Sequence, residues 1–224
     1  MNEIELTNLF SEAFPFWEGL SKWDKDTFLN SSQTVSFARG ATVHDGGECT
    51  GVILIKSGSL RLYLLSDEGK EVTLYRLFPG EMCIFSASCV LDSLTFDVFI
   101  DAEEDSECIV VGGCAYEGVW QRSDEVKIFT YETALSRFSD IMWIMQQILF
   151  MSMDKRLAIL LLDEIQVNGT DTVSMTHEMM ARHLGTAREV VTRMLKHMAS
   201  DGIVEVGRKG VTVLDKNKLR SIAY

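Results

Sequence analysis

Apolar residues recur along this chain with two different periods. Between residues 33 and 113, short β-rich runs alternate with turns that contain glycine, and one such turn, Asp67-Glu68-Gly69, has the composition of a hairpin loop. Short strands separated by tight turns are typical of an antiparallel sandwich or barrel. We therefore predict a β-roll here, preceded by two amphipathic segments at residues 4–14 and 24–30. The predicted strands are 34–37, a short run at Val43, 51–56, 60–65, 71–77, 94–102 and 108–111.

From Glu125 onward the period changes to that of a helix. Seven apolar residues are spaced alternately three and four positions apart, which is the a/d pattern of a coiled coil over three heptads. A second apolar row (134, 141, 144, 148 and 151) lies beside it, so one row could face a partner helix and the other the β-roll. A buried core helix in a monomer is the alternative, and a further helix is predicted at 154–166. The predicted dimerisation residues are Ile128, Tyr131, Leu135, Phe138, Met142, Met145 and Leu149.

The stretch from Thr176 to Ala199 has the spacing of a helix-turn-helix. Thr176 opens the first helix, and Ala181 is small at the point where two helices must approach closely. Gly185, four residues later, suits a left-handed turn, and Val191 faces inward from the second helix. The remaining apolar positions of this small predicted core are Met180, Leu184, Met194 and Leu195.

The outward face of the second helix carries residue types that read DNA. Arginine can donate two hydrogen bonds to guanine, and glutamate can accept one from the cytosine amino group. Beyond the helix, strands 203–206 and 211–214 flank a hairpin with a basic tip that suits phosphate contact, a wing. A solvated face with Glu189 and Arg193 paired at i,i+4 is the alternative. The predicted DNA-binding residues are Thr176, Thr186, Arg188, Glu189, Thr192, Arg193, Lys196, Arg208 and Lys209.

Composition and charge then separate two halves. The chain has 224 residues, 46% of them apolar, and no apolar run reaches transmembrane length. Taken over the whole chain, the net charge of −12 argues against a nucleic-acid binder. The charge is, however, unevenly distributed between the two parts of the chain. Residues 1–151 carry 10 Lys and Arg against 24 Asp and Glu, whereas residues 152–224 carry 11 against 9, which fits a DNA-binding head on an acidic body. Because the N-terminus is acidic and lacks a signal-peptide pattern, we expect a cytoplasmic protein with no membrane contact.

These motifs resemble the family of the cyclic-AMP receptor protein and the FNR oxygen regulator over nearly the whole chain. Residues 51–63, followed by Asp67-Glu-Gly-Lys-Glu-Val, look like that family's effector domain. Leu77-Phe-Pro-Gly-Glu81 is similar to its turn into the ligand region, and residues 186–196 are similar to its recognition helix.

The resemblance implies an α+β fold in three parts. These are an antiparallel β-roll of the cyclic-nucleotide-binding jelly-roll type (1–124), a long central dimerisation helix (125–151) and a winged helix-turn-helix (152–224). It also implies a homodimer. By the same resemblance, base reading falls to Arg188, Glu189 and Arg193.

The effector region departs from the family pattern. Nucleotide-binding members follow Gly-Glu with a short helix and an Arg-Ser/Thr pair, because a buried cyclic phosphate needs a cation. Here Met-Cys-Ile-Phe-Ser follows instead, and no Arg or Lys occurs between Arg76 and Arg122. We therefore predict that cyclic AMP is not the effector, and the cofactor stays unknown. The candidate effector residues are Gly80, Glu81, Cys83 and Cys89.

Five cysteines, an odd number in a cytosolic setting, are expected to be reduced thiols. An FNR-type iron–sulfur cluster needs cysteines near the N-terminus and none precedes Cys49, so no cluster is expected. Haem could be ligated by His44 or Cys83, although His44 is more simply a surface residue at a strand end. Cys83 and Cys89 could form a thiol sensor, or could be small buried hydrophobes.

The sequence thus predicts a non-enzymatic regulator that binds a palindromic operator on double-stranded DNA as a homodimer under the control of the β-roll. RNA polymerase is a further candidate partner. One alternative is a small-molecule-binding or enzymatic barrel of the cupin type, disfavoured because only His44 lies in the barrel region to serve as a metal-binding histidine. The other is a protein-interaction barrel whose winged helix serves as an adaptor. Activation and repression are not distinguished.

Overall fold

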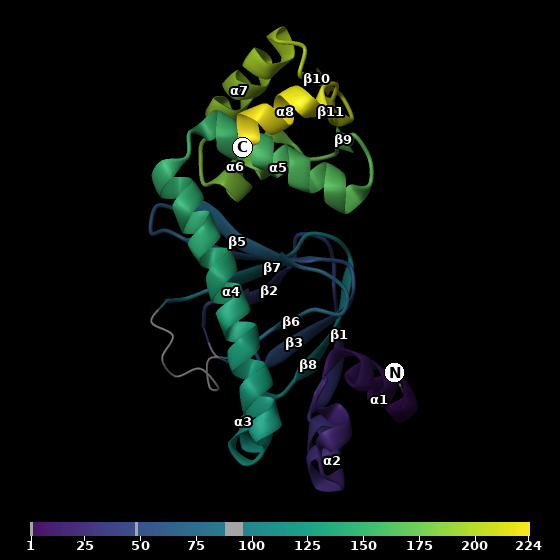
Figure 1. The fold of residues 1–224 in the computed structure, drawn as a ribbon. Coiled ribbons are helices and arrows are strands. Elements are labelled where there is room, and N and C mark those ends of the chain that lie inside the picture. The colour runs from purple at the N-terminus through teal and green to yellow at the C-terminus, as the bar shows by residue number, and fades with distance from the viewer. Residues whose placement is uncertain (1, 48, 88–95) are drawn as a thin grey trace. The chain divides into compact units, whose positions relative to one another are not determined.

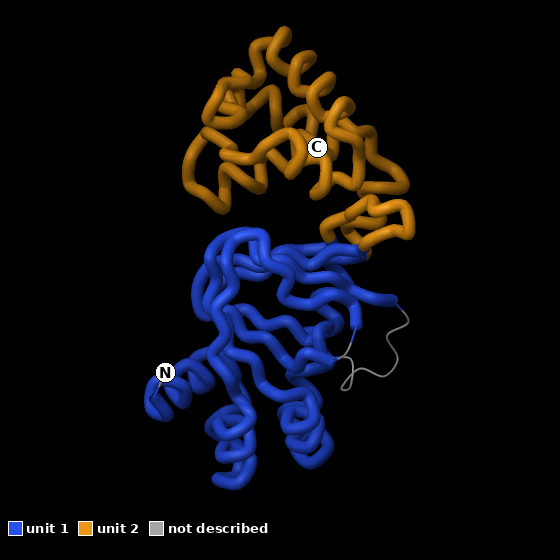
Figure 2. The backbone as a smooth tube through the Cα atoms, turned by 180° about the vertical axis from the view of Figure 1, so that it is seen from behind, with its two compact units in different colours: residues 1–64, 74–141 blue, residues 65–73, 142–224 orange. Residues whose placement is uncertain are grey.

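A computed structural model describes residues 2–47, 49–87 and 96–224. Figure 1 shows the elements, and Figure 2 shows the two compact units into which the chain divides. Unit 1 comprises residues 1–64 and 74–141, and unit 2 comprises residues 65–73 and 142–224. No helix in the described ranges is both long enough and apolar enough to span a bilayer.

Two four-stranded antiparallel sheets form the β-roll. Its central strands hold continuous buried runs, 52–55 and 60–63, because both faces of these strands are covered. One sheet has the order β1 (Ser32–Phe37), β8 (Ser106–Val111), β3 (Val52–Ser57) and β6 (Met82–Cys83). The other has the order β2 (Thr42–Asp45), β7 (Phe99–Ala102), β4 (Leu60–Leu65) and β5 (Glu71–Leu77).

Apart from shifts of one or two residues at strand ends, the strand predictions for the roll differ from the structure in two places. The predicted strand 94–102 becomes β7 only from Phe99, and residues 94 and 95 lie outside the described ranges. The two-residue strand β6 was not predicted, because so short a run shows no alternation and its pairing with Ile53 and Leu54 is set by the tertiary fold.

Among the described residues, two α-helices precede the roll in the sequence, and two follow it directly. α1 (Glu3–Ala13) begins at a capping box formed by Asn2 and Glu5. α2 (Lys22–Asn30) follows, and Phe10, Phe14 and Trp17 each pack against Phe28 at ring-centroid distances of 6.0–6.1 Å. α3 (Gly113–Arg122), which the sequence analysis missed, leads into the long helix α4 (Asp124–Phe150).

The C-terminal elements have their own core. α5 (Met153–Asn168) ends where Gly169 adopts a left-handed φ of 64°. The remaining elements are β9 (Thr172–Val173), α6 (His177–Leu184), α7 (Arg188–Ser200), β10 (Val204–Gly207), β11 (Gly210–Val213) and α8 (Lys216–Ala223). The strands pair in the order β10-β11-β9. The predicted α+β architecture of β-roll, long helix and helix-turn-helix with a small sheet is therefore confirmed, and α8 is an addition.

Candidate nucleic-acid interface

The turn between α6 and α7 has the geometry that the sequence spacing predicts. The Thr176 hydroxyl caps α6 by accepting a hydrogen bond from the Met179 amide at 3.1 Å. Ala181 is 2% exposed and Val191 is fully buried. Gly185 ends α6 with a φ of 60°, a conformation that strongly favours glycine. The two helices are therefore held as one unit by their packing and by this turn.

A buried arginine supports the same turn and was not predicted as a site residue. Arg156 of α5 is 7% exposed, and its guanidinium donates a hydrogen bond to the carbonyl oxygen of Leu184, the last residue of α6. Burial lowers the pKa of Arg156. A guanidinium on the carbonyl end of a helix also interacts favourably with the helix dipole. Arg156 thus positions the turn, although its sequence context gives no signal beyond a charge in an apolar helix.

The outward residues of α7 lie together on one concave surface. Its volume is about 320 Å³. In the part of the chain that the structure describes, Glu189 and Arg193 form no ion pair. The i,i+4 pairing that the sequence offered as an alternative is therefore not formed. The side chains that line this surface are Arg188, Glu189, Thr192, Arg193 and Lys196.

A larger cleft of about 590 Å³ lies between the N-terminal end of α6, the start of α7 and the β10–β11 hairpin. The exposed hairpin tip, Arg208 and Lys209, lines it together with Arg188 and Thr176. The wing and the recognition helix thereby present cations to a common space. Such an arrangement suits a phosphate backbone, because each Lys or Arg can neutralise a phosphate and release counterions.

Two of the predicted residues, Thr186 and Thr192, have internal hydrogen-bond partners. The Thr186 amide donates to the Ala181 carbonyl oxygen at 2.9 Å, and Thr186 is half-buried before α7 begins. The Thr192 hydroxyl lies 2.9 Å from the Arg188 carbonyl oxygen and 2.9 Å from Nδ1 of His177. The backbone of Thr186 is therefore part of the turn, and the Thr192 hydroxyl is committed within the protein.

The predicted effector region contains a cation that the sequence analysis missed because it comes from α4. Arg137 forms ion pairs with Glu81 at 3.0 Å and with Asp140 at 3.2 Å, and it lies over the Tyr75 ring at 4.8 Å from the centroid. Burial opposes the charge of Arg137, but its contacts with Glu81, Tyr75 and Asp140 together outweigh burial and raise the pKa of Arg137. Gly80 turns the chain with a φ of 87° just before Glu81.

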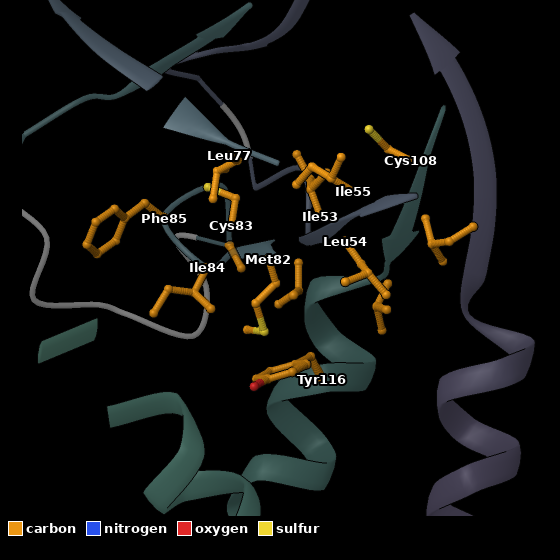
Figure 3. Packing of buried hydrophobic residues seen from close by; sticks show 14 of the residues in the cluster. Ile53, Leu54, Ile55, Leu77, Met82, Cys83, Ile84, Phe85, Cys108 and Tyr116 are labelled. Atoms are coloured by element: carbon orange, nitrogen blue, oxygen red, sulfur yellow. The ribbon is translucent and has the colours of Figure 1, made fainter. Parts of the chain in front are cut away.

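Cys83 is fully buried in the apolar core of the roll, among side chains such as Leu77 and Ile84 (Figure 3). Burial raises the pKa of the Cys83 thiol, which suppresses the thiolate form that reacts. Cys89 lies outside the described residues. The interpretation of His44 as a surface residue is wrong: it is 6% exposed, and its Nδ1 lies 2.7 Å from the Thr50 hydroxyl. Burial lowers its pKa.

The apolar seam of α4 is exposed along its whole predicted length. The seven residues are between 43% and 67% exposed: Ile128, Tyr131, Leu135, Phe138, Met142, Met145 and Leu149. By contrast, Ala134 and Ile141 of the second row pack against the core of unit 1. Contiguous exposed apolar surface of this kind is typical of interaction sites.

Fold and site together define a DNA-binding protein of the winged helix-turn-helix class, joined to a β-roll. The model of the Crp-like helix-turn-helix domain matches residues 155–222, and that of the cyclic nucleotide-binding domain matches residues 34–123. A structure from Eubacterium rectale, described as a transcriptional regulator of the crp/fnr family, is 42% identical. The match covers 94% of this chain and 98% of that one, with a TM-score of 0.90. The chain therefore belongs to the CRP/FNR family of transcription regulators, which is non-enzymatic.

Two curated proteins are also similar. The cyclic AMP receptor protein of Thermus thermophilus is 26% identical over 211 residues, which cover 94% of this chain and 97% of that protein. The cAMP-activated global transcriptional regulator Vfr of Pseudomonas aeruginosa is 22% identical over 186 residues, 79% of this chain and 86% of that protein.

Proposed function

We propose that this regulator binds a palindromic DNA operator as a homodimer in the cytoplasm and acts there on RNA polymerase. Residues 1–124 would receive the signal, 125–151 would join the two copies, and 152–224 would bind DNA. The observation that carries the proposal is the set of exposed cations on α7 and the wing, which have no carboxylate within 4.0 Å among the described residues. They are Arg188, Arg193, Lys196, Arg208 and Lys209.

Operator selection from randomised DNA tests this proposal with the full-length chain. We expect two inverted half-sites whose centres lie about one helical turn, roughly 10 base pairs, apart. Recovery of a single half-site would contradict the dimeric arrangement. A folded protein that enriches no DNA sequence would favour the adaptor alternative instead.

The homodimer rests on the exposed seam of α4, which is supported by its heptad spacing. Leu135→Asp places a charge at an a position, where it would be buried against the partner helix, and we expect monomers at micromolar concentration in sedimentation velocity. Ser136→Asp is the matched control, since Ser136 is an exposed neighbour off the seam. A wild-type chain that sediments as a monomer would contradict the proposal outright.

We also propose that cyclic AMP is not the effector, although two relatives are named for cyclic AMP. Three arginines of the roll and of α4 with little exposed side chain are already paired with carboxylates: Arg61 with Asp101, Arg76 with Glu103, and Arg137 with Glu81 and Asp140. A cyclic phosphate would have to displace one of these carboxylates. Calorimetry should therefore show no binding of cyclic AMP at micromolar concentration, and a micromolar dissociation constant would overturn this.

A thiol sensor is disfavoured by the burial of Cys83. In the folded protein we expect iodoacetamide to modify the exposed Cys114 and to leave Cys83 unmodified, as measured by peptide mass spectrometry. Modification of both at similar rates would restore the sensor hypothesis for Cys83.

A further inference from the structure

His177 occupies the junction of the three elements that line the larger cleft. It is the first residue of α6, it is half-buried, and it lines the cleft beside Arg188 and the wing. Nδ1 of its ring lies 2.9 Å from the hydroxyl oxygen of Thr192, on the second turn of α7. His177 thus links the first helix of the motif directly to the recognition helix.

The hydrogen positions around Thr192 follow from its neighbours. Its hydroxyl has one proton, and the Arg188 carbonyl oxygen at 2.9 Å can only accept it. With that proton donated, the Thr192 oxygen must accept from the second neighbour, so Nδ1 of His177 carries a hydrogen. In the opposite assignment, two oxygen acceptors would face each other at 2.9 Å with no proton between them. Neutral His177 therefore has its lone pair on Nε2.

Nε2 makes no hydrogen bond to any described residue. The charged side chains that line the cleft around His177 are three cations, Arg188, Arg208 and Lys209, and one carboxylate, Glu178. Burial lowers the pKa of His177 below its ordinary value of 6.5, and the charge of Arg188 lowers it further. The free protein accordingly holds His177 mostly neutral near pH 7. A phosphate in the cleft would raise the pKa of His177, because a nearby anion favours the charged imidazole.

We propose that His177 is a further DNA-contacting residue, in which Nδ1 holds Thr192 on the recognition helix while Nε2 takes up a proton, keeps it, and donates a hydrogen bond to a phosphate oxygen of the DNA backbone. The atoms balance simply: one proton from solvent adds to Nε2, and no bond in the protein breaks. This inference rests on the proposed DNA-binding function. It also limits Thr192: its hydroxyl has no proton left to donate to a base edge, so Thr192 can offer DNA only its methyl group and the remaining acceptor lone pair of its oxygen.

The direction of the pH dependence follows. The pKa of His177 is low in the free protein and is raised by phosphate in the complex, so the complex binds more protons. Operator affinity therefore rises as pH falls through the interval between the two pKa values. One proton taken up per protomer corresponds to at most about a tenfold gain per pH unit for each protomer, and so to at most about a hundredfold gain in the operator affinity of the dimer.

The experiment measures operator affinity at constant ionic strength from about pH 8 to about pH 5. His177→Asn retains an amide donor near the position of Nδ1 but removes Nε2, so we expect its affinity to lose most of the pH dependence and to be lower at the acid end. Thr192→Val keeps the imidazole, so the pH dependence should persist. His197→Asn is the control, since His197 is an exposed histidine near the end of α7 that lines neither concave surface.

Each outcome decides the matter. If wild type and His177→Asn bind with the same pH dependence, the inference fails while the DNA-binding function stands. If wild type binds no DNA at any pH, both fail. Nitrogen NMR of the free protein provides a second measurement: a hydrogen on Nδ1 of neutral His177 is expected, and a hydrogen on Nε2 instead would overturn the arrangement even if a variant folds poorly.

Discussion

Arginine side chains are used differently in the β-roll and in the helix-turn-helix region. Arg61 and Arg76 of the roll, and Arg137 of α4, are largely buried and each lies against a carboxylate. In the C-terminal region, Arg188 and Arg193 are exposed and have no carboxylate partner among the described residues. The buried arginines form ion pairs within the protein that stabilise the fold. The exposed arginines of α7 remain available to bind an external anion.

This difference explains why net charge is a poor guide here. The acidic total of −12 is concentrated in residues 1–151, where carboxylates such as Asp101 and Glu103 neutralise the local arginines. Fields from exposed charges separated by more than about 10 Å are screened at moderate salt. The charge relevant to the proposed DNA contact is therefore that of the nearby surface, where the cleft carries the cations Arg188, Arg208 and Lys209 against one carboxylate, Glu178.

The largest expected effect comes from removing a paired arginine. The Arg61 side chain is 6% exposed and lies 3.4 Å from Asp101 Oδ2, while Asp101 Oδ1 is buried without a partner. Arg61→Met should lower the free energy of unfolding by about 3 kcal/mol, because it leaves a mostly buried carboxylate uncompensated. Urea unfolding measures this change.

A double variant that replaces both Arg61 and its partner Asp101 serves as the control. Arg61→Met with Asp101→Asn should recover part of the lost stability, since no charge is then left unpaired. At a temperature where the variants are folded, operator affinity should match wild type. If a fully folded Arg61→Met protein lost DNA binding, Arg61 would not act through stability alone, and the distinction between fold-stabilising and DNA-binding arginines would be wrong.

The second effect concerns an unpaired arginine. Arg188→Ala should weaken operator binding by about 2 kcal/mol and relax base preference at one position per half-site, because a bidentate contact to guanine is lost. Stability should change by less than about 0.5 kcal/mol, as expected for an exposed residue. Selection from randomised DNA and urea unfolding measure the two quantities. An unaltered preference would remove Arg188 from the base-reading set.

Much of the C-terminal region could be predicted from sequence because its constraints are local. Gly185 must adopt a positive φ, and Ala181 must be small, so spacing alone places the turn. The seam of α4 was predictable for the same reason, since its residues share a face through the period of one helix. The exposure of Leu135 and Leu149 agrees with that spacing.

The effector region could be predicted less well because its contacts join distant segments. Arg137 meets Glu81 across 56 positions of sequence, and no local pattern around either residue indicates the pair. Likewise, its position at a strand end predicts that His44 lies on the surface, yet packing buries its side chain. The link between His177 and Thr192 spans 15 residues and depends on the angle between two helices, which spacing does not give.

The smallest effect is expected at the wing, where the comparison can be made between two lysines of the same region. Lys209 lies at the exposed hairpin tip and lines the cleft, whereas Lys216 is paired with Asp171 at 2.5 Å. Lys209→Ala should weaken binding about equally for all DNA sequences. It should also reduce the slope of log affinity against log salt by about 1 per protomer, the value for one phosphate contact.

Lys216→Ala should leave that slope unchanged, because its charge is already compensated by Asp171. Affinity measured over a series of salt concentrations on both operator and random DNA separates the two variants. If the two lysines lower the slope equally, pairing does not determine which cations meet DNA, and the contrast between the roll and the C-terminal region reduces to distance from the phosphates alone.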